Sequence, residues 1–223
     1  HNNKGIPTLV KLLFQTIIAI IFYIIFRKNG GTPTIEITFL RTSINLGWAY
    51  GLFILLVLVG TSNAVNITDG LDGLAGGLSV ITFLAYGVIT WGTTWLTGYQ
   101  DIAIFSFVLT GAIMGFLVFN SYPARVIMGD TGSLALGAAL ATIAILTRNE
   151  ISLILIGGVF VVETLSSLIQ IIAIRKFHKK VFKKAPLHHH FEELGWEEID
   201  IVKLFWTIGF LLSMIGVIYG VWL

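Results

Sequence analysis

Seven stretches of the chain are almost entirely apolar, and most polar residues gather between them. Each stretch approaches the ~20 residues that an α-helix needs to cross a bilayer. The fifth stretch is short and rich in Gly and Ala, which suits close packing between helices. We therefore predict an all-α fold, a polytopic transmembrane helix bundle with about seven spans. The predicted spans are residues 9–26, 48–64, 76–94, 103–119, 133–147, 151–174 and 202–222.

The basic residues predict the orientation of these spans. Because successive spans cross the membrane in opposite directions, the connecting segments fall into two sets. The first set is 1–8, 65–75, 120–132 and 175–201, and the second is 27–47, 95–102 and 148–150. Of the 14 Lys and Arg residues, ten lie nearer the first set and four nearer the second. The positive-inside rule then places the first set in the cytoplasm and the C-terminus outside. The outer segment 27–47 alternates Thr and Ile after Gly-Gly and Pro, which predicts a short periplasmic β-hairpin.

The composition agrees with a membrane protein. Only 12% of the residues are charged and 56% are hydrophobic, whereas soluble proteins average about 25% charged residues. A net charge of +2 does not suggest a nucleic-acid partner. The absence of cysteine excludes disulfides and cysteine-ligated metals. With no internal repeat or low-complexity linker, residues 1–223 are interpreted as one domain.

The first polar cluster is "NITDGLDGLAGG", directly after the second span. Asp69 and Asp72 are three residues apart, so on a helix they would share a face. Asn66 precedes Asp69 by one turn, and the glycines in this segment would allow a ligand to approach the backbone closely. The simpler alternative is that the carboxylates only complement the N-terminal dipole of the next helix.

The second cluster is "FNSYPARVIMGDTGS", before the fifth span. A Gly-rich turn that enters a helix offers backbone N–H groups to an anion, and Gly129 lies in such a turn. Asp130 beside it is able to hold Mg²⁺, which prefers one or two carboxylates together with phosphate oxygens. The alternative is an ordinary helix cap formed by Asp130 or Thr131. The segment is not a P-loop, because it has no "GK[ST]".

The third cluster is "KKVFKKAPLHHHFEELGWEEID". Its four lysines are expected to bind anionic lipid headgroups. The histidines His188, His189 and His190 cannot all face one point, but one or two of them could reach a phosphate or a nucleotide. Adjacent histidines lack the usual spacing of zinc ligands.

Two polar residues lie inside the predicted span 151–174. Glu163 is an ionisable residue at membrane depth, which is by default a hypothesis for a functional site. Gln170 lies seven residues further on and shares its helical face. The alternative for both is an interhelical hydrogen bond.

All three clusters fall on the predicted cytoplasmic face. Carboxylates, glycine turns, histidines and basic residues at the level of the lipid headgroups together indicate Mg²⁺-assisted phosphate chemistry, with a lipid as donor or acceptor. A transporter or flippase with Glu163 in its pathway is the alternative from another class, but it would place polar clusters at mid-depth or on both faces.

The segments "NAVNITDGLDGLAGG", "FNSYPARVIMGDTGSLALG" and "APLHHHFEELGW" resemble the motifs of the phospho-MurNAc-pentapeptide translocase branch of the polyprenyl-phosphate N-acetylhexosamine-1-phosphate transferases. The resemblance covers essentially the whole chain. It implies transfer of phospho-MurNAc-pentapeptide from UDP-MurNAc-pentapeptide to undecaprenyl phosphate, which forms lipid I and UMP for peptidoglycan biosynthesis. The histidine triplet favours this branch over a sister branch that transfers N-acetylglucosamine-1-phosphate.

The resemblance also implies the setting of the reaction. Family members use Mg²⁺, have ten transmembrane helices, form homodimers and lie in the bacterial cytoplasmic (inner) membrane. The seven spans therefore lead us to expect that three N-terminal helices precede this chain. An adjacent aspartate pair that the family uses in catalysis is expected just upstream of His1.

Site residues follow from matching positions. Asp130 matches the magnesium ligand, Asp69 an essential acidic residue, and His188 and His189 the histidines that contact substrate. Ile127 is a departure, because several relatives have an aromatic residue there that stacks on uracil. The positions matched to substrate binding, together with those indicated by the residues themselves, are Lys11, Asn66, Asp72, Asn120, Ile127, Gly129, Glu163, Gln170, His189 and His190.

Overall fold

The computed structural model describes residues 7–37, 42–93 and 98–222, and the prediction of a helical membrane bundle is confirmed. Seven described helices are long and apolar enough to cross a membrane. The helices are α1 (Thr8–Lys28), α2 (Ala49–Thr68), α3 (Leu74–Gly92), α4 (Tyr99–Asn120), α5 (Gly129–Leu146), α6 (Glu150–Ile156), α7 (Gly158–Phe177), α8 (Leu187–Glu193) and α9 (Glu198–Trp222).

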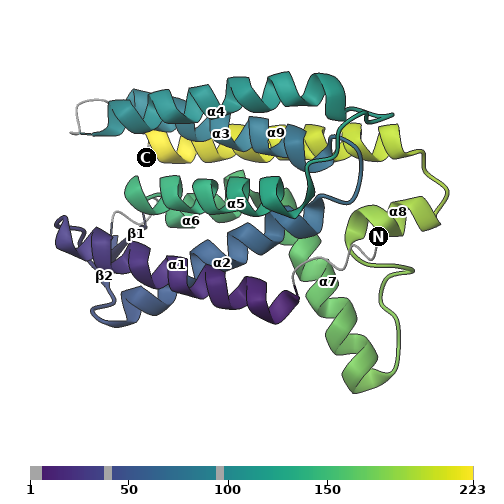
Figure 1. The fold of residues 1–223 in the computed structure, drawn as a ribbon, viewed down its shortest axis with the longest axis horizontal. Coiled ribbons are helices and arrows are strands. Elements are labelled where there is room, and N and C mark those ends of the chain that lie inside the picture. Colours follow the sequence, from purple (N-terminus) through teal and green to yellow (C-terminus); the bar gives the residue numbers. More distant parts are fainter. Residues whose placement is uncertain (1–6, 38–41, 94–97, 223) are drawn as a thin grey trace.

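Helix α3 lies at the centre of the bundle and is the most buried of the seven spans. It packs against α4 and α9, while α2 packs against α5 and α1 covers the outer side of α2. The main core gathers around α3, with Leu74, Phe83 and Tyr86 fully buried. Figure 1 shows these helices side by side and nearly parallel, so their ends form two opposite faces.

The predicted span 151–174 is wrong as a single helix. It is interrupted at Gly157, where α6 ends and α7 begins. A side chain at Gly157 would lie 2.9 Å from the carbonyl oxygen of Leu153. The adjacent glycines at 157 and 158 allow the sharp change of direction, and α7 then diverges from the bundle (Figure 1). The divergence carries α7 toward α8 and leaves a groove against α2.

The predicted hairpin is confirmed as a two-stranded antiparallel sheet. Strand β1 (Thr34–Ile37) pairs with β2 (Thr42–Asn45), and Ile35 faces Ile44. The Arg148 guanidinium holds the hairpin against the bundle by donating 2.8 Å hydrogen bonds to the carbonyl oxygens of Thr32 and Thr34. The turn between the strands, and Lys4 and Arg41 among the basic residues, lie outside the described residues.

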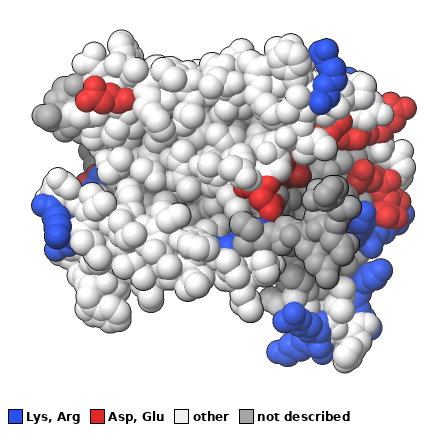
Figure 2. Space-filling model, in the orientation of Figure 1, with Lys and Arg blue, Asp and Glu red and all other residues white. Residues whose placement is uncertain are grey.

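Charged side chains gather at the two ends of the molecule. Figure 2 shows a white belt between them, with most blue and red atoms at the end where α8 lies. The segments between α2 and α3, between α4 and α5, and between α7 and α9 all meet at that end (Figure 1). The three predicted polar clusters are therefore on one face of the bundle.

Candidate active site

The segment between α2 and α3 is a turn. Helix α2 ends at Thr68, and Gly73 precedes α3 with a φ of +78°, a conformation that favours glycine. Asp69 interacts electrostatically with Asp130, whereas the Asp72 carboxylate accepts a 2.8 Å hydrogen bond from the Ala124 backbone N–H. The prediction that Asp69 and Asp72 share a helical face is therefore wrong, because residues 69–73 form a turn between two helices.

Asp130 is at the centre of a polar cluster formed by α1, α2 and α5. Its Oδ2 forms an ion pair with the Lys11 Nζ, and its Oδ1 accepts a 2.9 Å hydrogen bond from the Asn66 Nδ2. Asn66 also donates to the Ser133 hydroxyl one turn further along α5, at 2.9 Å. The N-cap position of α5 is Met128, and Asp130 and Thr131 lie inside the first turn, so the capping alternative does not describe them. Half of the Asp130 side chain remains exposed.

Asp69 is in an electrostatically unfavourable place. Burial and the nearby Asp130 carboxylate, in that order, raise its pKa to about 6. It follows the last residue of α2, where the helix dipole opposes a negative charge. The dipole alternative is thus excluded for Asp69. Two carboxylates that repel each other at a polar surface are typical of a site that receives a cation or a proton.

His188, on α8, contacts the same turn. Its side chain is fully buried, and its Nδ1 lies 2.9 Å from Oε2 of Glu163 on α7. Its Nε2 has no hydrogen-bond partner among the described residues. A Cβ placed on Gly70 would lie 2.3 Å from this Nε2, so the ring contacts the residue that follows Asp69. The structure therefore brings Asp69, Asp130 and His188 together around one turn.

The rest of the histidine segment separates into different environments. The His189 ring lies 4.3 Å from the His188 ring, centroid to centroid, and its Nδ1 pairs with Glu192. The His190 Nδ1 accepts a hydrogen bond from the Lys183 backbone N–H at 3.1 Å, so that atom is used to hold the loop. Gln170 has a similar role. Its Nε2 donates to the Phe182 carbonyl oxygen, and its Oε1 accepts from the backbone N–H groups of Val181 and Phe182.

The segment that joins α4 to α5 is shaped by Asn120. This buried residue donates from Nδ2 to the carbonyl oxygen of Val126 at 2.9 Å. Ile127 follows with 79% of its surface exposed. Gly129 then begins α5 with a φ of +65°, which places Asp130 in the first turn. Hydrogen bonds from Asn120 and to Asp72 thus hold the segment between α4 and α5 in place, and Ile127 lies exposed on its surface.

The carboxylates of Asp130 and Asp69 suit Mg²⁺ better than a metal ion that is coordinated entirely by protein side chains. Among the described residues, no three His, Cys, Asp or Glu side chains form a metal-binding group. Mg²⁺ does not require such a cage, since it is held by one or two carboxylates with water and phosphate oxygens. Asp130 is partly exposed and lies near a second carboxylate, Asp69. These two side chains match that requirement.

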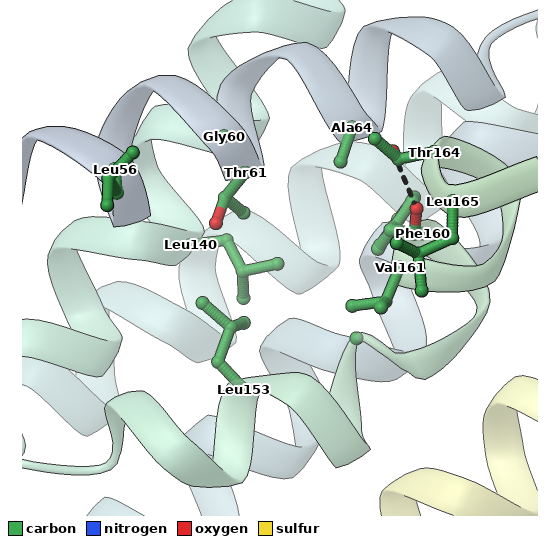
Figure 3. A pocket seen from close by; sticks show the side chains of 11 residues that line it. Leu56, Gly60, Thr61, Ala64, Leu140, Leu153, Phe160, Val161, Thr164 and Leu165 are labelled. Atoms are coloured by element: carbon green, nitrogen blue, oxygen red, sulfur yellow. Dashed lines mark hydrogen bonds between the residues drawn. The ribbon is translucent and has the colours of Figure 1, made fainter. Parts of the chain in front are cut away.

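Two apolar grooves flank α2 close to the polar cluster. One, of about 370 Å³, lies between α1, α2 and α5 and ends at Lys11. The other, of about 220 Å³, lies between α2, α5, α6 and α7. Figure 3 shows the second groove with Leu140, Leu153 and Val161 pointing into it. The Thr164 hydroxyl there donates to the Phe160 carbonyl oxygen at 2.9 Å, so its hydrogen-bonding capacity is turned away from the groove.

Sequence reasoning missed several polar residues that support the cluster. Gln15 lies one turn after Lys11 on α1 and donates to Ser62 at 3.2 Å. Asn63 donates to Gln15 at 3.0 Å, and Glu198 accepts a 2.7 Å hydrogen bond from the Asp72 backbone N–H. The i, i+4 spacing of Lys11 and Gln15 in an apolar span was an available signal. No local signal indicated Glu198, which is 126 residues away from Asp72.

Fold and site together define a multi-pass helical membrane protein with an acidic and imidazole-containing cluster at one end. Residues 3–148 match the model of glycosyl transferase family 4. A phospho-N-acetylmuramoyl-pentapeptide-transferase of Geobacillus sp. (strain WCH70) is 51% identical over 222 residues, and one of Bacillus subtilis (strain 168) is 49% identical. Each match covers 100% of this chain and 67% of the relative. The chain belongs to glycosyl transferase family 4.

Proposed function

We propose that this protein transfers phospho-MurNAc-pentapeptide from UDP-MurNAc-pentapeptide to undecaprenyl phosphate, forming lipid I and UMP. The observation that carries the proposal is the convergence of Asp69, Asp130, Lys11 and His188 on one turn at the end of a membrane bundle. The names and the roughly half-identical sequences of the relatives support the same activity. They also favour it over transfer of N-acetylglucosamine-1-phosphate.

Charge neutralisation is the main task of such a site, since both substrates carry phosphates that repel each other. Bound Mg²⁺ supplies neutralisation of the donor pyrophosphate and of the departing UMP. Asp130, with Asp69 nearby, would hold the ion, and Asn66 keeps the Asp130 carboxylate oriented. Lys11, paired with Asp130 in this structure, is placed to bind a substrate phosphate once the carboxylate is engaged elsewhere.

The transfer is proposed to be direct. An oxygen of the lipid phosphate forms a new bond to the sugar-bearing phosphorus of the donor. The bond from that phosphorus to the bridging oxygen breaks, and its electron pair leaves with UMP. The second pKa of a phosphate monoester is about 6, so near pH 7 the nucleophile is largely ionised and needs little base assistance. Isolation of a phospho-sugar bound covalently to an aspartate would contradict this route.

The lipid acceptor is proposed to reach the site from within the membrane. The groove between α1, α2 and α5 is lined mainly by apolar side chains and has Lys11 at one end. A phosphorylated isoprenoid has the complementary shape, a long apolar chain with an anionic head. The face that carries the cluster is then the cytoplasmic one, because the nucleotide donor is made in the cytoplasm and the positive-inside rule favours that face.

The test is a transfer assay with radiolabelled donor and undecaprenyl phosphate on the protein in native membranes. We expect lipid-linked product and UMP in equal amounts, both dependent on Mg²⁺. UDP-N-acetylglucosamine should give no product. Transfer from that donor at a comparable rate would contradict the proposed specificity, and product formation at full rate in EDTA would contradict the proposed metal.

A further inference from the structure

Glu163 is a buried carboxylate inside the apolar helix α7. Its side chain is 0% exposed, and an ionised carboxylate in such a place is costly unless it is fully hydrogen-bonded. Both of its oxygens have partners on the same residue. Oε1 accepts from the His188 backbone N–H at 3.1 Å, and Oε2 lies 2.9 Å from the His188 Nδ1. The carboxylate thus fixes the backbone and the ring of one histidine.

This arrangement determines which ring nitrogen of His188 is available. An ionised carboxylate can only accept hydrogen bonds, so the Nδ1 must carry the proton. The Nε2 is then the only open position on the ring. It is buried and has no partner among the described residues, although buried polar atoms are nearly always hydrogen-bonded. An unpartnered nitrogen on a ring held so firmly indicates a ligand atom that completes it.

Gly70 provides the space into which the Nε2 projects. A Cβ at this position would lie only 2.3 Å from the Nε2 and 3.0 Å from the Cε1 of His188. Any other residue at position 70 would therefore displace the ring. Since Gly70 directly follows Asp69, the Nε2 is held at the edge of the acidic cluster.

We infer that Glu163 is a positioning residue that fixes the Nδ1–H tautomer and the orientation of His188, so that the Nε2 meets a phosphate oxygen of the substrate beside the Asp69–Gly70 turn. The inference rests on the proposed function and adds to it a role for a carboxylate that touches no substrate. The Nε2 accepts when the phosphate oxygen carries the shared proton, and donates when the ring carries it. In the second state the Glu163 carboxylate offsets the charge of the ring.

The first test is Glu163→Gln. A glutamine keeps the length of the side chain, but only one of its two terminal atoms accepts hydrogen bonds. Because the His188 backbone N–H can only donate, the glutamine oxygen faces it. The NH₂ group then faces the ring Nδ1, and the ring proton moves to the Nε2. We expect kcat to fall at least about tenfold with a smaller change in KM, as for other partners that orient a histidine from behind. We also expect ¹⁵N-histidine NMR to show loss of the Nδ1–H form.

Glu150→Gln is the matched control. Glu150 is also a buried glutamate, 3% exposed, but it lies in α6 and accepts a 2.6 Å hydrogen bond from Tyr50. The same chemical change there should leave kcat and the His188 tautomer unaltered. An equal fall in kcat in both variants would mean that any buried carboxylate is needed for the fold, and would overturn the inference.

Gly70→Ala displaces the ring without touching Glu163, and remains informative if Glu163→Gln does not fold. We expect a similar fall in kcat, and we expect the double variant to be no slower than the slower single variant, because both act through the Nε2. Additive losses would overturn the inference. Wild-type kcat in Glu163→Gln would overturn it while leaving the proposed function intact. If Glu163→Gln changed the His188 tautomer but the wild-type protein had no transferase activity, only the proposed function would be refuted.

Discussion

At the scale of single residues, the site contains one carboxylate, Asp69, whose charge is unfavourable without a ligand. Asp69 is partly buried at the C-terminal end of α2, close to Asp130. Lys11 compensates only Asp130. An ionised Asp69 therefore weakens the fold of the metal-free protein, and a bound cation would offset that cost.

The stability of the metal-free protein should reveal this cost. The raised Asp69 pKa means that the folded state binds the proton more tightly than the unfolded state does. The free energy of unfolding therefore falls as the pH rises from about 4 to about 6, and the loss is complete above that range. Asp69→Asn removes the cost. After allowance for solvent screening of a partly exposed group, we expect its Tm in EDTA to exceed that of the wild type by roughly 2–4 °C at pH 8.

The comparison at low pH is the control for that measurement. At pH 4 the wild-type carboxyl is already neutral in the folded protein, so the two proteins should unfold at the same temperature. Saturating Mg²⁺ at pH 8 should stabilise the wild type more than the variant. A Tm difference that is the same at pH 4 and pH 8 would show that Asp69 ionisation plays no part.

Asp130→Asn tests the proposed metal ligand. The amide keeps the size of the side chain and a hydrogen bond with Asn66, but it removes the charge that holds Mg²⁺. We expect UMP release to fall at least about 100-fold, comparable to the loss of other groups that stabilise charge in a transition state. The variant should still insert in the membrane. Lys179→Ala, in the basic segment after α7, should stay near wild-type activity, and equal losses would contradict the separation of site from lipid-binding surface.

At the scale of the elements, α2 and α5 are held so closely that their contact positions the cluster. A Cβ at Gly137 on α5 would lie 2.6 Å from the Ser62 Cα and 2.6 Å from the Thr61 carbonyl oxygen on α2. Both are backbone atoms, so no side chain can move aside. Asn66 and Asp130 lie on these two helices and form their hydrogen bond across the same interface.

Gly137→Ala should therefore separate the helices. Overpacking of this kind costs about 1–3 kcal/mol, and we expect a lower Tm in detergent together with a loss of UMP release. Gly111→Ala on α4 is the matched control, because nothing lies within 4 Å of the added methyl group. It should be neutral or slightly stabilising. If the Tm of Gly137→Ala were unchanged, the α2–α5 contact at this position would have room for a methyl group, which would contradict the prediction.

The sequence pattern predicted the helices better than it predicted the breaks and long-range contacts between them. Runs of apolar residues located the seven spans, because helix length and bilayer thickness constrain them. The interruption at Gly157 was missed, since two glycines lower the mean hydropathy of a long apolar span only slightly. Glu163 was recognised by its charge in an apolar segment, but its partner His188 lies 25 residues away. Contacts over such separations depend on how α7 leaves the bundle, which no local pattern records.

At the scale of the whole molecule, the uneven charge of the two ends predicts how the protein sits in the membrane. Of the 12 Lys and Arg residues in the described part of the chain, nine lie at the end with the site and three at the end with the hairpin. By the positive-inside rule, we expect the end with the site to face the cytoplasm. The described residues contain seven candidate spans, so we expect the start of α1 and the end of α9 to lie on opposite sides of the membrane.

Cysteine labelling tests this orientation directly, because the chain contains no cysteine. Lys179→Cys lies after α7 at the end with the site, and Ser43→Cys lies in the exposed strand β2 at the other end. We expect a membrane-impermeant maleimide to label Ser43→Cys in intact spheroplasts and Lys179→Cys only in inverted vesicles or after permeabilisation. The cysteine-free parent should stay unlabelled in both preparations. Labelling of Lys179→Cys from outside would place the cluster on the face that a cytoplasmic nucleotide donor cannot reach, and the proposed reaction would then be impossible in this protein.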